Sequence, residues 1–246
     1  MKILFYKARI IFLIILFASF VFCEQSLAIV TKKTGEVDYK YYLNNDFNSE
    51  LNFGAELFNN DLVRTGKDGF LKFAYLDDGT TIKIHHNSEL YIRGQINENS
   101  ISKRINMSNG LLKLDVSKQN YDEFKVITPT SVASVKGTSF VLESDDDGDK
   151  FYGFEGVVEI KNKESNQIIK LSRNLKVISL PDGNINSEII TQNDTQILNT
   201  FSEVDQEVEE EFIPEQEESN QSIKELKIKV YSPSGEEKVI IIKYNE

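Results

Sequence analysis

The segment Val126-Ile-Thr-Pro-Thr-Ser-Val-Ala-Ser-Val-Lys-Gly-Thr-Ser-Phe-Val-Leu-Glu143 decides the fold class of this chain. Most of it consists of β-branched and small residues, which favour extended strands. Two breaks divide it, Thr128-Pro129 and Gly137-Thr138. Pro129 lacks a backbone N–H and is expected at a strand start, edge or corner, while Gly137 permits a bulge or a close backbone approach. The segment therefore predicts short strands separated by two corners.

The same pattern extends on both sides of this segment, from about residue 29 to residue 180. Leu71, Phe73 and Tyr75 alternate with other residues, as on one buried face of a strand. Asp77-Asp78-Gly79 then provides a turn in which glycine adopts a positive φ at little cost. Turn signals recur roughly every 8 to 12 residues, which is typical of an all-β sandwich, barrel or short solenoid.

Five motifs in order resemble the FecR family: the segment 126–143, Asn60-Asp-Leu-Val-Arg-Thr-Gly66, Phe73-Ala-Tyr-Leu-Asp-Asp-Gly-Thr80, Gly110-Leu-Leu-Lys-Leu-Asp-Val116 and Glu155-Gly-Val-Val-Glu-Ile160. The resemblance covers about Gly35 to Leu180 and implies a FecR-like two-sheet sandwich or short solenoid over residues 29–192. It implies structural roles for the motif residues Asp61, Gly66, Asp78, Gly79, Gly110, Thr128, Pro129, Gly137, Thr138, Phe140 and Gly156.

The resemblance also implies a role outside the cytoplasm. In family members that regulate transcription, a cytoplasmic anti-sigma segment precedes a membrane helix, and the external domain receives a signal from an outer-membrane transducer. Here nine residues precede the hydrophobic run, too few for an anti-sigma domain. The chain therefore resembles the stand-alone type of FecR-domain protein, for which we expect protein interaction, scaffolding or signal sensing in the cell envelope, with an envelope protein as partner.

The N-terminal residues 1–28 have the pattern of a signal peptide or an N-terminal anchor. Three basic residues precede the uncharged run Ile10–Cys23, which is shorter than the roughly 20 residues of a membrane span. Ser26-Leu27-Ala28 provides small residues at the −3 and −1 positions of a cleavage site. Cys23, the sole cysteine, either ends the hydrophobic run or carries a lipid. The chain is thus expected to be exported, to the periplasm or cell envelope, and to contact membrane only through this segment if it is uncleaved or lipidated.

The residues after 192 predict three further parts. Apolar residues at helical spacing predict an amphipathic helix over 193–210, which packs on the β domain or on a partner. Residues 211–222 lack positive charge and have few apolar groups, which predicts an acidic flexible linker. Residues 223–246 alternate apolar and polar residues on both sides of Ser232-Pro-Ser-Gly235, which predicts a β-hairpin. Its apolar face needs either this chain or another molecule to cover it.

Charge and residue types argue against several function classes. The net charge is −11, no basic stripe is visible, and nucleic acid is not an expected partner. His85 and His86 are neighbours on a strand and point to opposite faces, so they cannot both hold one metal ion. Asp145-Asp-Asp-Gly-Asp149 lacks the Glu at position twelve of a calcium loop and predicts a solvated hairpin tip. We find no motif for a catalytic triad, a metal or a cofactor, and expect a non-enzymatic protein.

Two functions remain open on the sequence. A protein-interaction module should have an exposed strand edge or apolar patch. A carbohydrate-binding or surface-adhesion module should have a shallow groove with exposed aromatic side chains, for which Tyr91 and Tyr152 are the candidates. Lys136 occupies the basic position of the family motif and is the third candidate for a partner contact.

Overall fold

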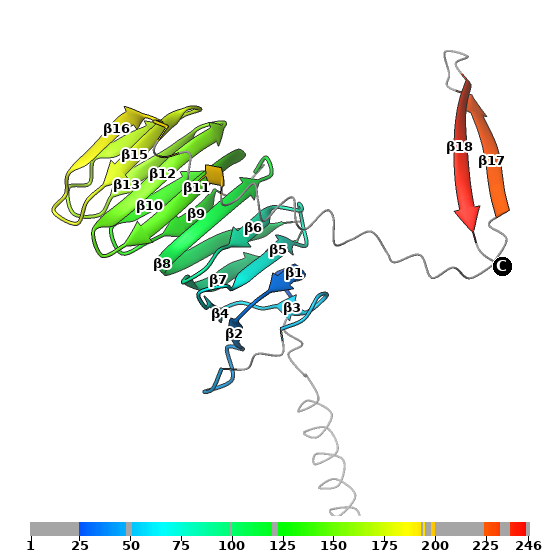
Figure 1. Ribbon diagram of the computed structural model, residues 1–246, viewed down its shortest axis with the longest axis horizontal. Coiled ribbons are helices and arrows are strands. Elements are labelled where there is room, and N and C mark those ends of the chain that lie inside the picture. Colours follow the sequence, from blue (N-terminus) through cyan, green and yellow to red (C-terminus); the bar gives the residue numbers. More distant parts are fainter. Residues whose placement is uncertain are drawn as a thin grey trace, which may run out of the picture. The chain divides into compact units, whose positions relative to one another are not determined.

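The computed structural model of the chain describes residues 25–47, 51–98, 100–119, 123–192, 194, 198–199, 224–231 and 237–244. These residues divide into two units, one within Met1–Leu198 and one within Asn199–Glu246. The first unit contains a sixteen-stranded sheet and the second a two-stranded sheet (Figure 1).

The strands of the first unit follow one another closely along the chain and stack side by side (Figure 1). Their bounds are β1 (Ala28–Thr34), β2 (Val37–Lys40), β3 (Glu56–Leu57), β4 (Asp61–Thr65), β5 (Phe70–Tyr75), β6 (Thr81–Ile84), β7 (Glu89–Ile96), β8 (Ile101–Val116), β9 (Phe124–Ile127), β10 (Ser131–Val135), β11 (Thr138–Asp145), β12 (Gly148–Glu155), β13 (Val158–Asn162), β14 (Ile168–Leu171), β15 (Leu175–Ser179) and β16 (Ile185–Ile189).

The sheet forms two layers that share the long strand β8. Layer A has the order β3-β1-β5-β6-β8-β11-β12-β15-β16. Layer B has the order β2-β4-β7-β8-β9-β10-β13-β14. Residues 101–109 of β8 pair with β7 in layer B, and residues 110–116 pair with β11 in layer A. All pairs are antiparallel except β8 with β9, which is parallel.

Gly110 lies where β8 passes from one layer to the other. Its φ is +123°, a conformation that L side chains rarely adopt. A Cβ added there would lie 2.2 Å from Ser88 Oγ and 2.4 Å from Ser88 Cα. Ser88 cannot retreat easily, because its Oγ accepts the Leu111 N–H at 3.0 Å and donates to the His85 carbonyl at 2.8 Å. The change of layer at this point therefore requires glycine.

The hydrophobic core lies between the two layers. Leu112 and Leu114 of β8 and Phe140 of β11 are buried from layer A, and Val126 of β9 is buried from layer B. The ring of Tyr75 on β5 meets the ring of Phe124 on β9 edge-on, with centroids 6.0 Å apart. Burying a large apolar side chain contributes about 1.5–3 kcal/mol, so the inward faces of both layers stabilise the stack.

The all-β prediction is confirmed: β1–β16 form an open two-layered sheet, as the alternating pattern indicates. The residues at the predicted cleavage site after Ala28 are among those that the structure describes. Leu27 and Ala28 are buried, and Ala28 pairs with Leu57 and Tyr75. Cleavage after Ala28 would therefore remove two residues that pack in the core.

Several predicted segments lie wholly or mostly outside the described residues. These are the signal peptide or anchor over 1–28, of which residues 25–28 are described, and the acidic linker over 211–222. Of the predicted helix over 193–210, the structure describes residue 194, which lies in a turn, and residues 198–199, which are helical.

The second unit contains two antiparallel strands, β17 (Lys224–Tyr231) and β18 (Glu237–Tyr244). Leu226 pairs with Ile242, and Ile228 pairs with Ile240. Within the described part of the chain, none of the helical residues forms a helix long and apolar enough to cross a membrane.

Candidate functional site

The first family motif is organised by Asp61 at the start of β4. Its carboxylate is fully buried and accepts hydrogen bonds from the Tyr39 hydroxyl at 2.5 Å, the Tyr42 N–H at 3.0 Å and the Phe58 N–H at 2.7 Å. Burial raises the pKa of the Tyr39 hydroxyl, and the hydrogen bond to Asp61 raises it further. Asp61 therefore ties β2 and the loop before β4 together, which is a structural role.

The other motif glycines lie where strands end. Gly66 follows β4, Gly79 lies between β5 and β6, Gly137 lies between β10 and β11, and Gly156 lies between β12 and β13. The last two meet, because a Cβ on Gly156 would lie 2.6 Å from the Gly137 carbonyl oxygen. These positions allow neighbouring turns to approach closely.

Thr128 and Asp149 form a buried pair that connects the two layers. The Thr128 hydroxyl donates to Asp149 Oδ2 at 2.5 Å and accepts the Ser131 N–H at 2.8 Å. The Ser144 hydroxyl donates to Asp149 Oδ1 at 2.6 Å. Burial raises the pKa of the Asp149 carboxyl above its ordinary value, and this effect outweighs the hydroxyl hydrogen bonds that lower it.

The surroundings of this pair correct one sequence interpretation. Residues 146 and 147 form the turn between β11 and β12, but Asp149 is buried and does not belong to a solvated tip. Of the remaining motif residues, Pro129 is exposed after β9, while Thr138 and Phe140 are buried in β11.

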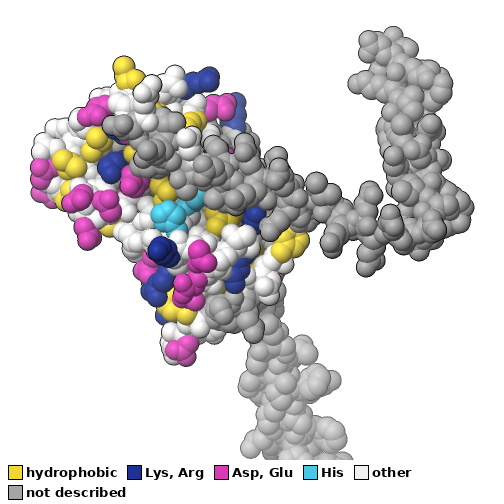
Figure 2. Space-filling view, in the orientation of Figure 1, with side chains coloured by type: hydrophobic (Ala, Val, Ile, Leu, Met, Phe, Trp, Pro, Cys, Tyr) yellow, Lys and Arg dark blue, Asp and Glu magenta, His cyan; other side chains and the backbone are white. Residues whose placement is uncertain are grey.

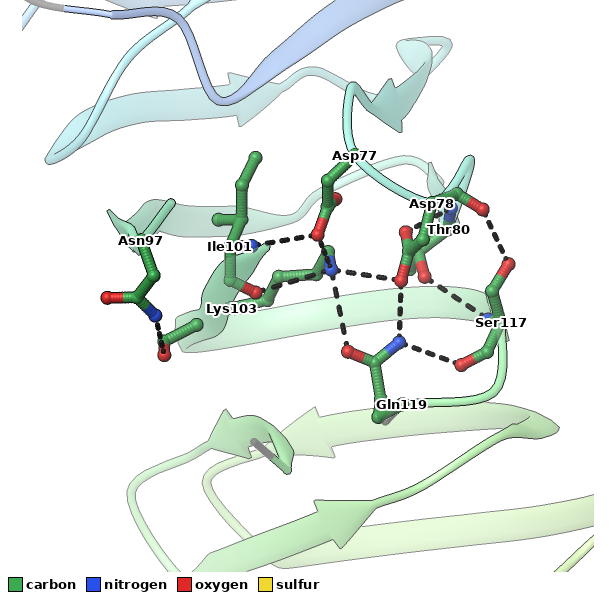
Figure 3. A network of polar contacts seen from close by, with 9 residues as sticks. Asp77, Asp78, Thr80, Asn97, Ile101, Lys103, Ser117 and Gln119 are labelled. Carbon is green, nitrogen blue, oxygen red and sulfur yellow. Dashed lines mark hydrogen bonds and ion pairs between the residues drawn. The ribbon is translucent and has the colours of Figure 1, made fainter. Parts of the chain in front are cut away.

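A buried lysine, Lys103, lies at the centre of a polar network between the two layers (Figure 3). Its Nζ donates to Asp77 Oδ2 at 2.7 Å and to Asp78 Oδ2 at 2.9 Å, in the turn between β5 and β6. The Gln119 amide donates to Asp78 Oδ2 at 2.7 Å, and Gln119 Oε1 lies 3.4 Å from Nζ. Lys103 Nζ also lies 5.5 Å from the centre of the Tyr75 ring.

Hydrogen bonds and the Lys103 charge offset the cost of burying the Asp78 carboxylate in this network. Burial raises the pKa of the Asp78 carboxyl, but hydrogen bonds from the Thr80 N–H, Lys103 and Gln119 together bring it below its ordinary value. The turn motif at Asp77-Asp78-Gly79 thus also supplies the counter-ions of a buried lysine. Sequence reasoning missed this, although Lys103 alternates in phase with the buried Ile101 and Ile105.

The outer face of layer B carries a hollow of about 760 Å³ that we call the basic hollow. It is lined by Asn59, Asn60, Arg93, Gly94, Gln95, Ser102, Lys103, Arg104, Glu123, Lys125 and Lys136. Arg93 lies on β7, Arg104 on β8 and Lys125 on β9. In register, Arg93 is opposite Arg104, and Arg104 is opposite Lys125, so three cations occupy neighbouring positions on neighbouring strands.

The alternation of each strand directs these cations outward. Ile92, Ile105 and Val126, their neighbours along the chain, are buried in the core. Like charges on adjacent strands destabilise a sheet unless other charges compensate. Among the described carboxylates, none forms an ion pair with Arg93, Arg104 or Lys125. Within the described residues, this row of cations is therefore a feature of layer B that packing does not explain.

The three predicted contact residues have different surroundings. Lys136 is exposed at the rim of the basic hollow and forms an ion pair with Glu123 at 3.1 Å. Tyr91 is half-buried, and the Arg93 guanidinium lies 5.6 Å from the centre of its ring. Tyr152 is 1% exposed and offers no surface to a partner.

The surroundings of Tyr152 include an ion pair between Lys176 and Asp194. On β15, Lys176 lies opposite Tyr152 and forms an ion pair with Asp194 at 2.9 Å. Burial raises the pKa of the Tyr152 hydroxyl, and the Glu143 and Asp194 carboxylates raise it further.

The histidines and carboxylates do not assemble a metal site among the described residues, where no group of three or more suitable ligands occurs. His85 is buried, and its ring meets the Phe70 ring edge-on with centroids 5.2 Å apart. His86 is exposed, so the two side chains lie in different surroundings. On the face in Figure 2, acidic, basic and apolar side chains are interspersed over the described surface.

One comparison with known proteins, a family-model match, agrees with the sequence motifs. Residues 61–159, from β4 into β13, match the family model described as FecR protein. A search of curated proteins found no match. Two crystal structures of a proposed anti-sigma factor from Parabacteroides distasonis are similar, with TM-scores of 0.45 and 0.43 and sequence identities of 18% and 20%. Each alignment covers 52% of this chain and spans 59% of the crystallised chain. This chain therefore contains a FecR domain at residues 61–159.

Proposed function

We propose that this chain is an exported, non-enzymatic module that binds a protein partner in the cell envelope, for interaction, scaffolding or signal sensing. The basic hollow carries this proposal. Arg93, Arg104 and Lys125 lie side by side without described carboxylate partners, which costs stability in the free domain. A bound partner that supplies the missing negative charge would remove that cost. Export is supported by the uncharged run Ile10–Cys23 and the basic residues that precede it.

The side chains of the basic hollow suit binding. Glu123 is the one carboxylate among its lining residues, and it is held in an ion pair by Lys136. The lining also includes cations and amides that supply hydrogen-bond donors, namely Arg93, Arg104, Lys125, Asn59, Asn60 and Gln95. Lys103, by contrast, is buried and bound to Asp77 and Asp78. Such a surface can orient a polar partner.

Carbohydrate binding is the second candidate, and the aromatic side chains count against it. A sugar-binding groove usually presents an exposed aromatic face. Tyr152 is buried, and Tyr91 is half-buried with the Arg93 guanidinium near its ring. No aromatic side chain lines the basic hollow within the described part of the chain. A protein partner is therefore the better fit.

Site-directed photo-crosslinking in intact cells tests the proposal. A photoreactive benzoylphenylalanine replaces Gln95, which is exposed in the basic hollow, and in a control replaces Lys72 on β5 of layer A. We expect a discrete adduct with an envelope protein at Gln95 and none at Lys72. Equal adducts at both positions, or recovery of the chain from the cytosol, would contradict the proposal.

A further inference from the structure

We infer that the basic hollow binds an extended acidic peptide segment, whose carboxylates lie across strands β7, β8 and β9. This inference rests on the proposed function and names the chemistry of the partner. Neighbouring strands lie about 4.8 Å apart, so the row from Arg93 through Arg104 to Lys125 spans roughly 10 Å. Side chains on one face of an extended peptide recur about every 6.8 Å, a spacing that three long cationic side chains can follow.

Arg93 is held ready for such a ligand. Its guanidinium lies near the Tyr91 ring, with 5.6 Å between the guanidinium carbon and the ring centre. Its Nε is buried and has no hydrogen-bond partner in the described protein, so the terminal guanidinium nitrogens are the donors we assign to a ligand. A planar guanidinium binds a carboxylate through two parallel hydrogen bonds, and one that is already positioned loses little freedom on binding. Arg93 and Arg104 can therefore each take a carboxylate, with Lys125 as the third charge.

The amide side chains around the row favour a peptide. Asn59, Asn60 and Gln95 line the basic hollow beside the cations. Asn59 Oδ1 accepts the Gly94 N–H at 3.2 Å, which leaves its NH₂ group to donate to a carbonyl oxygen of the ligand. Peptide backbones present such carbonyl groups at every residue. Single-stranded nucleic acids bind through aromatic stacking, which these lining residues do not supply.

The test measures binding of labelled synthetic peptides to the whole protein by fluorescence anisotropy. One octapeptide alternates glutamate and serine, and its matched control replaces every glutamate with glutamine. We expect saturable binding of the glutamate peptide, at least about tenfold tighter than that of the control, since each charge-assisted hydrogen bond contributes roughly that factor. Affinity should fall as salt rises, because the charges are solvent-accessible.

Two substitutions locate the binding surface. Arg104→Gln should weaken binding of the glutamate peptide by about tenfold, and the variant should fold, because Arg104 is exposed. Lys170→Gln is the matched control, since Lys170 lies on the same layer outside the basic hollow and pairs with Glu159 at 3.4 Å. It should leave binding unchanged.

Three results would overturn the inference. These are equal binding of the glutamine peptide, equal losses in both variants, and an oligogalacturonate of the same charge binding as tightly as the glutamate peptide. If an envelope partner crosslinks at Gln95 while the glutamate peptide shows no preference, only the acidic chemistry fails. If the glutamate peptide binds but no site-specific adduct forms in cells, only the proposed cellular role fails.

Discussion

Replacing Lys103 with methionine measures how much the buried charge network contributes to the free energy of unfolding. The Lys103 side chain is 1% exposed, while those of Asp77 and Asp78 are 14% and 22% exposed. Methionine keeps most of the apolar length of the lysine, so the change in packing should cost less than about 1.5 kcal/mol. The main effect is the loss of the ammonium group that both carboxylates share.

The expected loss follows from this geometry. Removing one partner of a buried ion pair costs about 3–5 kcal/mol, because the other charge stays buried without compensation. Both carboxylates retain some contact with water, which places Lys103→Met at the lower end, near 3 kcal/mol at pH 7. Since domains of this size unfold at a cost of about 5–15 kcal/mol, the change should be large.

The pH dependence provides a second observable. The folded pKa of the Asp78 carboxyl is lowered, so its contribution to stability is present above its unfolded pKa and is lost as pH falls through the folded pKa. Without Lys103, a main cause of that lowering disappears. The difference in unfolding free energy between Lys103→Met and the parent should therefore narrow as pH falls below about 4, where carboxyl groups protonate.

Urea unfolding followed by far-UV circular dichroism measures these effects, since the chain has no tryptophan. Lys170→Met is the control, because Lys170 and Glu159 form an exposed pair with 69% and 50% exposed side chains, worth under about 1 kcal/mol. Combining Lys103→Met with Asp77→Asn and Asp78→Asn should recover part of the loss. A loss below about 1 kcal/mol for Lys103→Met at pH 7, or one equal to the control, would refute the reasoning.

Three further predictions address the turns and the second buried carboxylate. Gly110→Ala should lower the free energy of unfolding by about 3 kcal/mol or more, because the added Cβ would collide with Ser88. In the matched variant Gly79→Ala, the added Cβ meets nothing within 4 Å, and the cost should be about 1 kcal/mol. Similar thermal midpoints for the two variants would contradict this. The folded pKa of the Asp149 carboxyl is raised, so its contribution to stability is present below its unfolded pKa and is lost as pH rises through the folded pKa. Asp149→Asn should therefore lose less stability above about pH 4 than the parent, and parallel denaturation profiles across pH would count against it. Thr128→Val should cost about 1–3 kcal/mol in urea unfolding, since two buried hydrogen bonds are lost, and a cost below about 0.5 kcal/mol would show that water replaces them.

Local features of the sequence were enough to predict the fold class and the turns. In a strand, successive side chains point to opposite faces, so buried positions alternate with more exposed ones. The burial of residues in β5 and in the first half of β8 follows this alternation. Gly79 and Gly110 mark positive φ, which is a property of the single residue. Lys136 stays a predicted contact that follows from a motif position, and its side chain lines the basic hollow.

Features that depend on which strands become neighbours could not be predicted from the sequence. Nothing in the sequence around Tyr152 indicates that its side chain is buried or that the Asp194 carboxylate lies near enough to raise the pKa of its hydroxyl. Lys103 reads as one polar residue in an alternating strand, and its counter-ions come from a turn about 25 residues away in the other layer. The sequence shows no basic stripe, yet the sheet builds a row of three cations from β7, β8 and β9.

Residue by residue, this sequence determines an all-β chain with glycine turns and an inward and an outward face on each strand. Only the tertiary structure decides that Arg93, Arg104 and Lys125 share one row and that Lys103 meets Asp77 and Asp78. The physical reason is that backbone conformation is chosen locally, by sterics and turn chemistry, whereas register and layer order are chosen by burial of the whole core. Strand register and layer order in turn decide which charged side chains meet.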